Sequence, residues 1–198
     1  MGRFVYICGF VLFAFFTKAS AQSYDVNIIG PALIKIHGSS NVNKFMLSYT
    51  KDVARQRKLT LGNIENNRQA IAGSNRIALE VDAFSSSHKM ITTDFKKMLQ
   101  MGKYPVINIE ISRLIINPSN PTSPFVMAVL TLAGTKRIEV LPVMIVKRPN
   151  NQMQLSSMHR VSLKNYNLSP PKKLMGMVNV NDEVFIEITL IAQYQKTT

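Results

Sequence analysis

Apolar and polar residues alternate along most of this chain. Apolar side chains occupy every second position in residues 76–83, 106–112 and 184–190. A period of two places them on one face of a strand, so the pattern predicts half-buried β-strands. Between clusters of Gly, Pro, Asn and Ser that are typical of turns, further strands are expected over residues 33–37, 42–50, 59–64, 125–133, 138–146 and 153–163. The chain is therefore predicted to contain about eight or nine strands.

One segment, near residues 88–101, follows a different period. Ile91 and Phe95 begin a row of apolar residues spaced three and four positions apart, which predicts a helix of about three turns. Ser87 or a neighbouring hydroxyl residue is expected to cap its N-terminus, and Gly102 its C-terminus. Many short antiparallel strands with a single helix are typical of a mainly β domain, either a closed barrel or a sandwich.

The interior of such a barrel is the first candidate for a functional site. A barrel of about eight strands is just wide enough for its side chains to fill it or to hold one elongated ligand. The strand faces that would line a ligand cavity carry almost no charge, and they contribute Leu79, Val81, Ile107, Ile109, Ile111, Leu130, Leu132, Val140, Ile186, Ile188 and Leu190. The same residues suit an ordinary packed core, so the pattern leaves both a hollow and a filled barrel open.

The start of the chain has the build of a secretory signal peptide. Arg3 precedes an uninterrupted apolar run over residues 4–16, and a small-residue triplet ending at Ala21 follows. Cleavage is predicted before Gln22. The run is shorter than the roughly twenty apolar residues that cross a bilayer. We therefore expect an exported mature chain, residues 22–198, that forms one domain.

The net charge of the chain is +13. Loss of Arg3 and Lys18 with the leader would leave +11, and a positive field of this size attracts anionic partners. The basic residues gather within residues 51–58 and in pairs further along the chain, with few aromatic residues between them. Nucleic-acid platforms combine basic grooves with stacking rings, so nucleic acid is not a predicted partner. An anionic membrane surface is a partner that the charge permits.

Residues that would form a catalytic or metal centre are sparse. His37, His88 and His159 lie on three separate segments, without the local spacing of common zinc sites. Cys8 is the only cysteine, and it falls in the predicted leader. No serine lies in a Gly-x-Ser-x-Gly elbow. The sequence thus predicts a protein that is not an enzyme and that holds neither a metal nor a cofactor.

Several segments, in order, resemble the YceI-like family. The opening is a glycine- and serine-rich turn that leads into a strand with an aromatic residue, and it is followed by a short helix with a Tyr-Pro pair, a central hairpin and an alternating last strand. These parts correspond here to residues 36–45, 90–99 with Tyr104 and Pro105, 130–136 with 140–143, and 163–166 with Pro170, Pro171, Gly176 and 182–184. The chain departs from the family at Ala133, where a histidine is usual, and after Ser40, where a His-Asp pair is frequent.

The resemblance implies a lipocalin-like antiparallel barrel that binds a polyisoprenoid or another lipid-like molecule. It implies a bacterial protein, and with the leader a periplasmic or secreted location. Tyr104, His159 and Tyr166, and beside them Asn165, lie at or near strand ends of these segments, so they are candidates for polar contacts at the cavity mouth. A bound isoprenoid or fatty-acid-like molecule is the only ligand expected.

Two functions remain open from the sequence. The first is a non-catalytic carrier of a long-chain amphiphile in a hollow barrel. The second is an interaction protein with a filled barrel, whose basic surface binds anionic envelope components or a protein partner. A contiguous apolar cavity of several hundred cubic ångströms would favour the carrier. The oligomeric state is not predicted.

Overall fold

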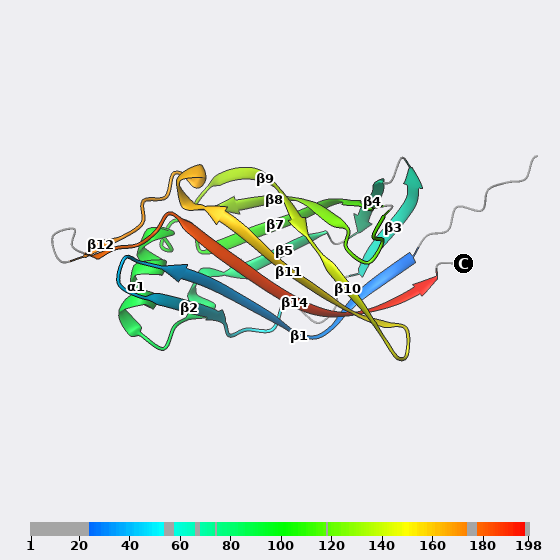
Figure 1. Cartoon of the computed structure of the whole chain (residues 1–198), viewed down its shortest axis with the longest axis horizontal. Coiled ribbons are helices and arrows are strands. Elements are labelled where there is room, and N and C mark those ends of the chain that lie inside the picture. The colour runs from blue at the N-terminus through cyan, green and yellow to red at the C-terminus, as the bar shows by residue number, and fades with distance from the viewer. Residues whose placement is uncertain are drawn as a thin grey trace, which may run out of the picture.

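Antiparallel β-strands build nearly all of the structure, a computed structural model that describes residues 24–53, 58–65, 68–73, 75–117, 119–173 and 178–196 (Figure 1). Within these residues twelve strands join in one sheet, and two short strands form a second. The strands of the large sheet are β1 (Tyr24–Ser39), β2 (Lys44–Tyr49), β3 (Lys58–Glu65), β4 (Arg68–Gly73), β5 (Arg76–Glu80), β6 (Phe84–Ser85), β7 (Val106–Ile115), β8 (Phe125–Leu132), β9 (Thr135–Pro142), β10 (Met144–Arg148), β11 (Gln152–Ser162) and β14 (Glu183–Lys196). The small sheet pairs β12 (Lys172–Lys173) with β13 (Val178–Asn179).

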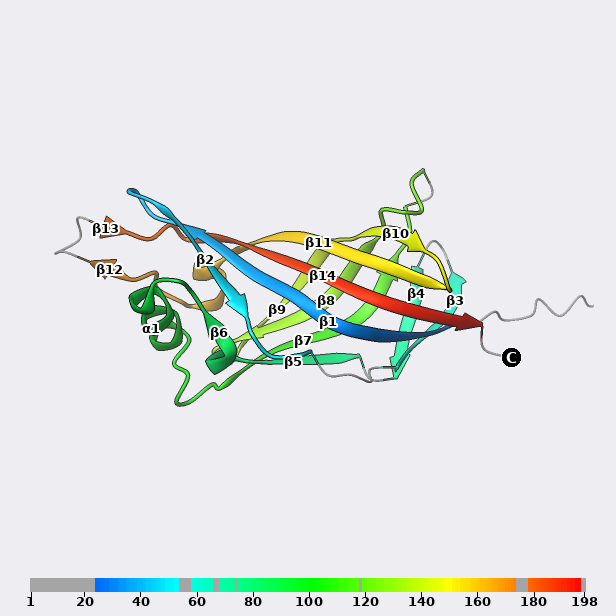
Figure 2. The same ribbon diagram turned by 90° about the horizontal axis from the view of Figure 1, so that it is seen from below.

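The large sheet follows the order β10-β11-β14-β1-β3-β4-β7-β8-β9, with β2 added beside β1, β6 beside β2 and β5 beside β7. Long ladders join β14 to both β1 and β11, and in the first of them Ile34 lies opposite Ile188. Figures 1 and 2 show the sheet wrapped so that β1, β11 and β14 form one wall and β5, β7 and β8 the other. The prediction of a mainly antiparallel β fold is therefore confirmed.

No ladder closes this sheet into a ring within the described residues. Its two edge strands, β9 and β10, are consecutive segments of one run that is interrupted only at Val143. β9 pairs with β8, whereas β10 pairs with β11. The amides of Val143 and Ile145 donate to the carbonyl oxygens of Pro124 and Thr122, at 2.9 and 2.8 Å. The two edges of the sheet are thus joined by the backbone at Val143 and not by pairing of β9 with β10. Instead of the predicted ring of about eight paired strands, the described residues form an unclosed sheet of twelve strands.

The core lies between the two walls. Ile34 comes from one wall and Leu79, Ile107 and Leu130 from the other, and all four are buried in one cluster. Their strands alternate, as the sequence predicts, because every second side chain enters the core. Burial of each such side chain stabilises the fold by about 1.5–3 kcal/mol.

The helix α1 (Lys89–Met98) packs across one end of the sheet (Figures 1 and 2). His88 is its N-cap, and no side chain caps the first turn, so the predicted hydroxyl cap is wrong. The predicted Gly102 cap is also wrong, because the helix ends at Leu99 and Gln100 takes the left-handed conformation with φ 52°. Two single-turn 3-10 helices, η1 (Val81–Ala83) and η2 (Leu163–Tyr166), lie at strand ends.

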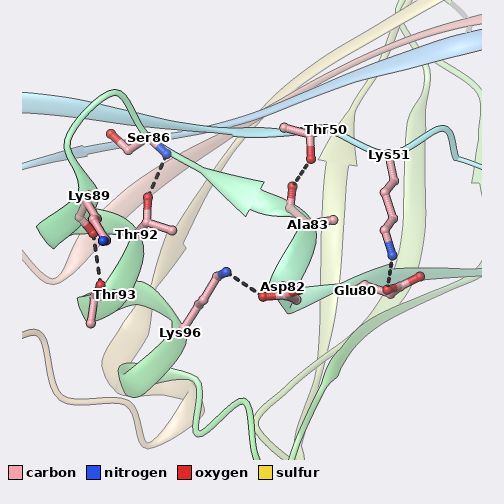
Figure 3. Close-up of polar contacts among 10 residues, drawn as sticks. All are labelled: Thr50, Lys51, Glu80, Asp82, Ala83, Ser86, Lys89, Thr92, Thr93 and Lys96. Atoms are coloured by element: carbon pink, nitrogen blue, oxygen red, sulfur yellow. Dashed lines mark hydrogen bonds and ion pairs between the residues drawn. The ribbon is translucent and has the colours of Figure 1, made fainter.

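Polar contacts hold α1 against the strands beside it (Figure 3). The Lys96 ammonium donates to Asp82 Oδ1 at 2.6 Å. The amide of Ser86 donates to Thr92 Oγ1 at 2.9 Å, which ties the first turn to the segment that enters the helix. The hydrogen bond from Lys96 lowers the pKa of the exposed Asp82 carboxyl. These contacts fix which face of the helix is turned toward the end of the sheet.

Candidate functional site

A cavity of about 530 Å³ lies where α1 faces β2 and the start of β14. Twelve of its fifteen lining residues are apolar, and three are polar. We call it the α1 groove, and it is lined by Ser40, Val42, Asn43, Phe45, Leu47, Met90, Ile91, Asp94, Phe95, Met98, Leu163, Pro171, Val178, Val180 and Val184. Its volume lies within the range of about 300–1,000 Å³ that is typical of small-molecule sites.

The helical period explains how α1 forms one side of this groove. Ile91, Phe95 and Met98 recur at four- and three-residue spacing, so they share the face turned toward the strands. Phe95 is buried and contacts Phe84, with the ring centroids 5.3 Å apart. Met90, one position before Ile91, is 65% exposed. The groove therefore extends from the core to the protein surface.

The opposite side of the groove is built by β2. Phe45 and Leu47 alternate toward the groove, as the period of two requires. The ring of Phe45 packs directly over Gly38, its partner on β1, and a Cβ atom at Gly38 would overlap the ring. Gly38 thus provides the space in which the Phe45 ring lies at the edge of the groove.

Gly38→Ala is expected to reduce the volume of the α1 groove. The added methyl group would displace the far end of the Phe45 side chain, which lines the groove. Unfolding by urea should show a loss of about 1 kcal/mol, because strained packing is partly relieved by the movement of one ring. A crystal structure of the variant would measure the shift, and an unmoved Phe45 ring would contradict this account.

The interior between the walls is nearly filled by its own side chains. A hollow of about 50 Å³ remains there, and we call it the inner hollow. Of the predicted cavity residues, those that line it are Leu79, Ile107, Ile109, Leu130, Leu132, Ile186 and Ile188. This space is far below the size of a typical ligand site. The predicted strand faces thus come together as foreseen, but they form chiefly a packed core.

The other four predicted cavity residues line neither space. Val81 is buried in the core, and Ile111 and Leu190 pack against it. The prediction that Val140 faces the interior is wrong, since its side chain is 44% exposed. The reason is register: Met127, its β8 partner, alternates with the buried residues of that strand, so both side chains project outward.

Four side chains separate the α1 groove from the inner hollow. Phe95, Met98, Leu163 and Val184 line both spaces. Phe95 and Met98 come from the helix, whereas Leu163 begins η2 and Val184 lies in β14. These residues form the floor of the groove. A ligand chain in the groove would therefore end against this floor.

A polar cluster bridges the unclosed part of the sheet. His159 Nε2 and Glu139 Oε2 lie 2.8 Å apart, and the Tyr166 hydroxyl donates to Glu139 Oε1 at 2.5 Å. The Glu139 carboxylate thus joins β9, β11 and η2. The Nε of Arg137 donates to the carbonyl oxygen of Asn165 at 2.9 Å beside it. Tyr166 is almost fully buried, and burial, followed by the hydrogen bond to Glu139, raises the pKa of its phenol.

The three predicted mouth residues therefore have other positions. His159 and Tyr166 are brought together by Glu139, which the sequence analysis missed because a single Glu on a strand carries no distinctive pattern. Tyr104 lies apart from them, with its ring over Gly134 of the β8–β9 turn. None of the three lines the α1 groove or the inner hollow.

Tyr166→Phe is expected to lower the free energy of unfolding at neutral pH by about 1–3 kcal/mol, because Glu139 loses a hydrogen bond. It should also remove part of the alkaline instability of the protein. In the wild type the folded state keeps the phenol proton, whereas the unfolded chain loses it above about pH 10. Stability contributed by Tyr166 is thus fully present below that pH and is lost as pH rises.

The measurement is urea unfolding of both proteins at neutral pH and at about pH 11, above the ordinary tyrosine pKa. The variant should lose less stability than the wild type between the two values. Equal losses would show that the buried phenol does not titrate with unfolding.

Within the described ranges no three His, Cys, Asp or Glu side chains gather to hold a metal ion. No helix in the same part of the chain has the length and apolar character needed to span a bilayer. The predicted leader, residues 1–21, lies outside the described residues.

Comparison with known proteins gives matches in structure only, because no family model and no curated protein matches the chain. Burkholderia cenocepacia BcnA matches with a TM-score of 0.59 and 16% identity, over 81% of this chain and 95% of BcnA. A polyisoprenoid binding domain from Saccharophagus degradans, implicated in plant cell wall breakdown, gives 0.55 and 9%, over 87% and 98%. A Campylobacter jejuni YCEI protein gives 0.48 and 11%, over 62% and 71%.

The chain shares the fold of BcnA and of the Saccharophagus degradans domain. The resemblance drawn from the ordered sequence segments is thus confirmed at the level of the fold. At identities of 9–16%, the likeness concerns the path of the chain and not individual residues. Function must therefore be argued from the α1 groove itself.

Proposed function

We propose that this YceI-like protein binds a lipid-like molecule, with the apolar chain of that molecule in the α1 groove, and that it acts as a non-catalytic carrier. The observation that carries the proposal is the groove: about 530 Å³, lined by twelve apolar residues and open to the surface beside Met90. The polyisoprenoid-binding description of the Saccharophagus degradans domain, which shares the fold, supports the same class of ligand.

Transfer of apolar surface from water supplies the binding energy. A long alkyl or isoprenoid chain in water exposes surface that costs about 25 cal/mol per square ångström. The groove presents Phe45, Leu47 and Phe95 to such a chain, and none of the described residues that line it is basic. Selectivity should therefore follow chain length and width more than the chemistry of the head group.

Polar groups are confined to three positions of the groove. Ser40 and Asn43 lie in the turn between β1 and β2, and Asp94 lies on α1. The Ser40 hydroxyl donates to Asn43 Oδ1 at 3.0 Å, so this turn is held in one shape. An uncharged head group that donates a hydrogen bond, such as an alcohol, would find its acceptors here.

The location proposed for this activity is outside the cytoplasm. Residues 1–21 support it, because their charge, apolar run and small-residue triplet match a leader that is removed. In an aqueous compartment a free long-chain molecule would aggregate or return to a membrane. A protein that shields the chain makes its transfer through water feasible.

The test combines extraction with a chain-length series. Mass spectrometry of an organic extract from natively purified protein should detect a co-purified long-chain molecule. Calorimetry with linear and isoprenoid alcohols should show affinity that rises up to about fourfold for each added methylene and then levels off when the groove is full. Weak affinity that does not depend on length would overturn the proposal.

A further inference from the structure

The outward face of the β9–β10 run is apolar, which is unusual for a solvent-exposed sheet surface. Every second residue from Ile138 to Val146 projects outward, and all five of these residues are apolar. We call this set the outer stripe: Ile138, Val140, Pro142, Met144 and Val146. All five are exposed, with Ile138 the most accessible at 68%.

Neighbouring strands widen the stripe on both sides. On β8, Phe125 lies opposite Pro142 and Val129 opposite Ile138, and directly opposite residues project from the same face. On β11, Met158 is also exposed. The apolar surface therefore extends beyond a single strand. Outward faces of antiparallel sheets usually carry polar residues, and a larger apolar patch marks an interaction site.

Basic residues bound the outer stripe at both ends. Lys136 and Arg137 precede it, Lys147 and Arg148 follow it, and all four are exposed. In the part of the chain that the structure describes, none of the four forms an ion pair with an acidic side chain. Arg137 and Arg148 donate instead to the neutral oxygens of Asn165 and Gln154.

The acidic groups nearest to this surface are already paired. Glu110 lies opposite Val129 and pairs with Arg76 at 3.5 Å. Glu187 lies opposite Met158 and pairs with His37 at 2.8 Å. The stripe thus combines apolar side chains with cations that no neighbouring acid neutralises.

We propose that the outer stripe docks on the surface of an anionic lipid membrane. The apolar side chains would enter the boundary between head groups and acyl chains. Lys136 and Arg148 continue the period of two on the outward face, so these two cations would contact lipid phosphates. A second copy of this chain is a poorer occupant, because pairing two stripes would bring both sets of cations together. The proposal is independent of the α1 groove, since it needs no ligand in it.

The experiment measures co-sedimentation with vesicles of phosphatidylcholine, alone or with about one third phosphatidylglycerol, an anionic lipid. All variants are purified in the same form, so residues outside the stripe contribute equally. Ile138→Thr/Met144→Gln should weaken binding to the anionic vesicles by about tenfold, because two exposed apolar side chains no longer enter the lipid.

Two further variants test the apolar and the electrostatic parts of the proposal. Leu33→Thr/Met46→Gln removes apolar side chains of similar exposure on β1 and β2, and it should bind like the wild type. Lys136→Gln/Arg148→Gln should weaken binding to anionic vesicles by about tenfold, with no change on phosphatidylcholine alone. Added salt should reduce the wild-type affinity in the same direction.

Each alternative outcome is decisive. Equal binding by Ile138→Thr/Met144→Gln and by its β1–β2 control would overturn the proposal, as would equal binding to both vesicle compositions. A dimer in analytical ultracentrifugation that only the stripe variant loses, with vesicle binding unchanged, would assign the stripe to a second copy and would also overturn it.

Discussion

Ile91→Asp is expected to lower the affinity of the protein for a long-chain alcohol by at least about 100-fold, because a carboxylate would have to be desolvated against the ligand chain. Ile91 packs against the core and lines the α1 groove. The aspartate side chain is too short to carry its charge out to water. The position lies in the first turn of α1, where an acidic residue is compatible with the helix dipole. Calorimetry with an alcohol of the length that fills the groove gives the measurement.

Thr93→Asp supplies the matched control. Thr93 lies two positions further along α1, on its exposed side, and its hydroxyl donates to the Lys89 carbonyl within the helix. The control adds the same charge to the same helix without placing it in the groove. It should retain wild-type affinity and a similar melting temperature. Equal affinity of Ile91→Asp and the control would place the ligand outside the groove.

The strands were predictable where one face of each is buried and the other is not. The structure confirms residues 184–190 as part of β14 and residues 76–80 as β5, whereas residues 81–83, expected to continue that strand, form the 3-10 helix η1. β4 was missed, because Arg68–Gly73 has no clear alternation. The expected strand over 138–146 instead crosses Val143, where the chain exchanges one partner strand for another. A local period carries no information about such an exchange.

The site was less predictable, for a physical reason. Ile91, Phe95 and Met98 were recognised as one apolar helix face, but an apolar face indicates burial and not what covers it. The groove lies where α1 stands away from β2, and α1 is placed by contacts such as that of Lys96 with Asp82 of η1, which no apolar period indicates. The strand faces proposed as a cavity pack against each other instead. Ile107 and Leu130 from one wall belong to the same buried cluster as Ile34 from the other.

Because Val140 was predicted to face the interior, the outer stripe to which it belongs was missed. Val140 was assigned to the interior, yet the inward positions of β9 are those that alternate with Val140, and Glu139 is one of them. The apolar residues of this run face outward. Periodicity therefore defines two faces correctly, while the partner strand decides which one is inside.

Phe95→Ala is expected to lower the free energy of unfolding by about 3–5 kcal/mol, as for other buried aromatic residues reduced to alanine. Phe95 contacts Phe84 and belongs to the floor between the α1 groove and the inner hollow. Removal of its ring should join the two spaces. The chain length at which the affinity for alcohols stops rising should therefore increase, even though the folded state is less stable. Urea unfolding and the chain-length series measure the two effects separately.

Phe95→Leu distinguishes the contribution of Phe95 to core packing from its place in the floor of the α1 groove. Leucine keeps an apolar side chain between the two spaces and leaves a smaller cavity, so the loss of stability should be well below that of alanine. The chain-length limit should then stay close to that of the wild type. If alanine and leucine gave the same limit as the wild type, Phe95 would not bound the ligand chain, and its contribution would be to the core alone. A longer limit for alanine only would establish that the side chains of α1 determine how far a ligand enters this fold.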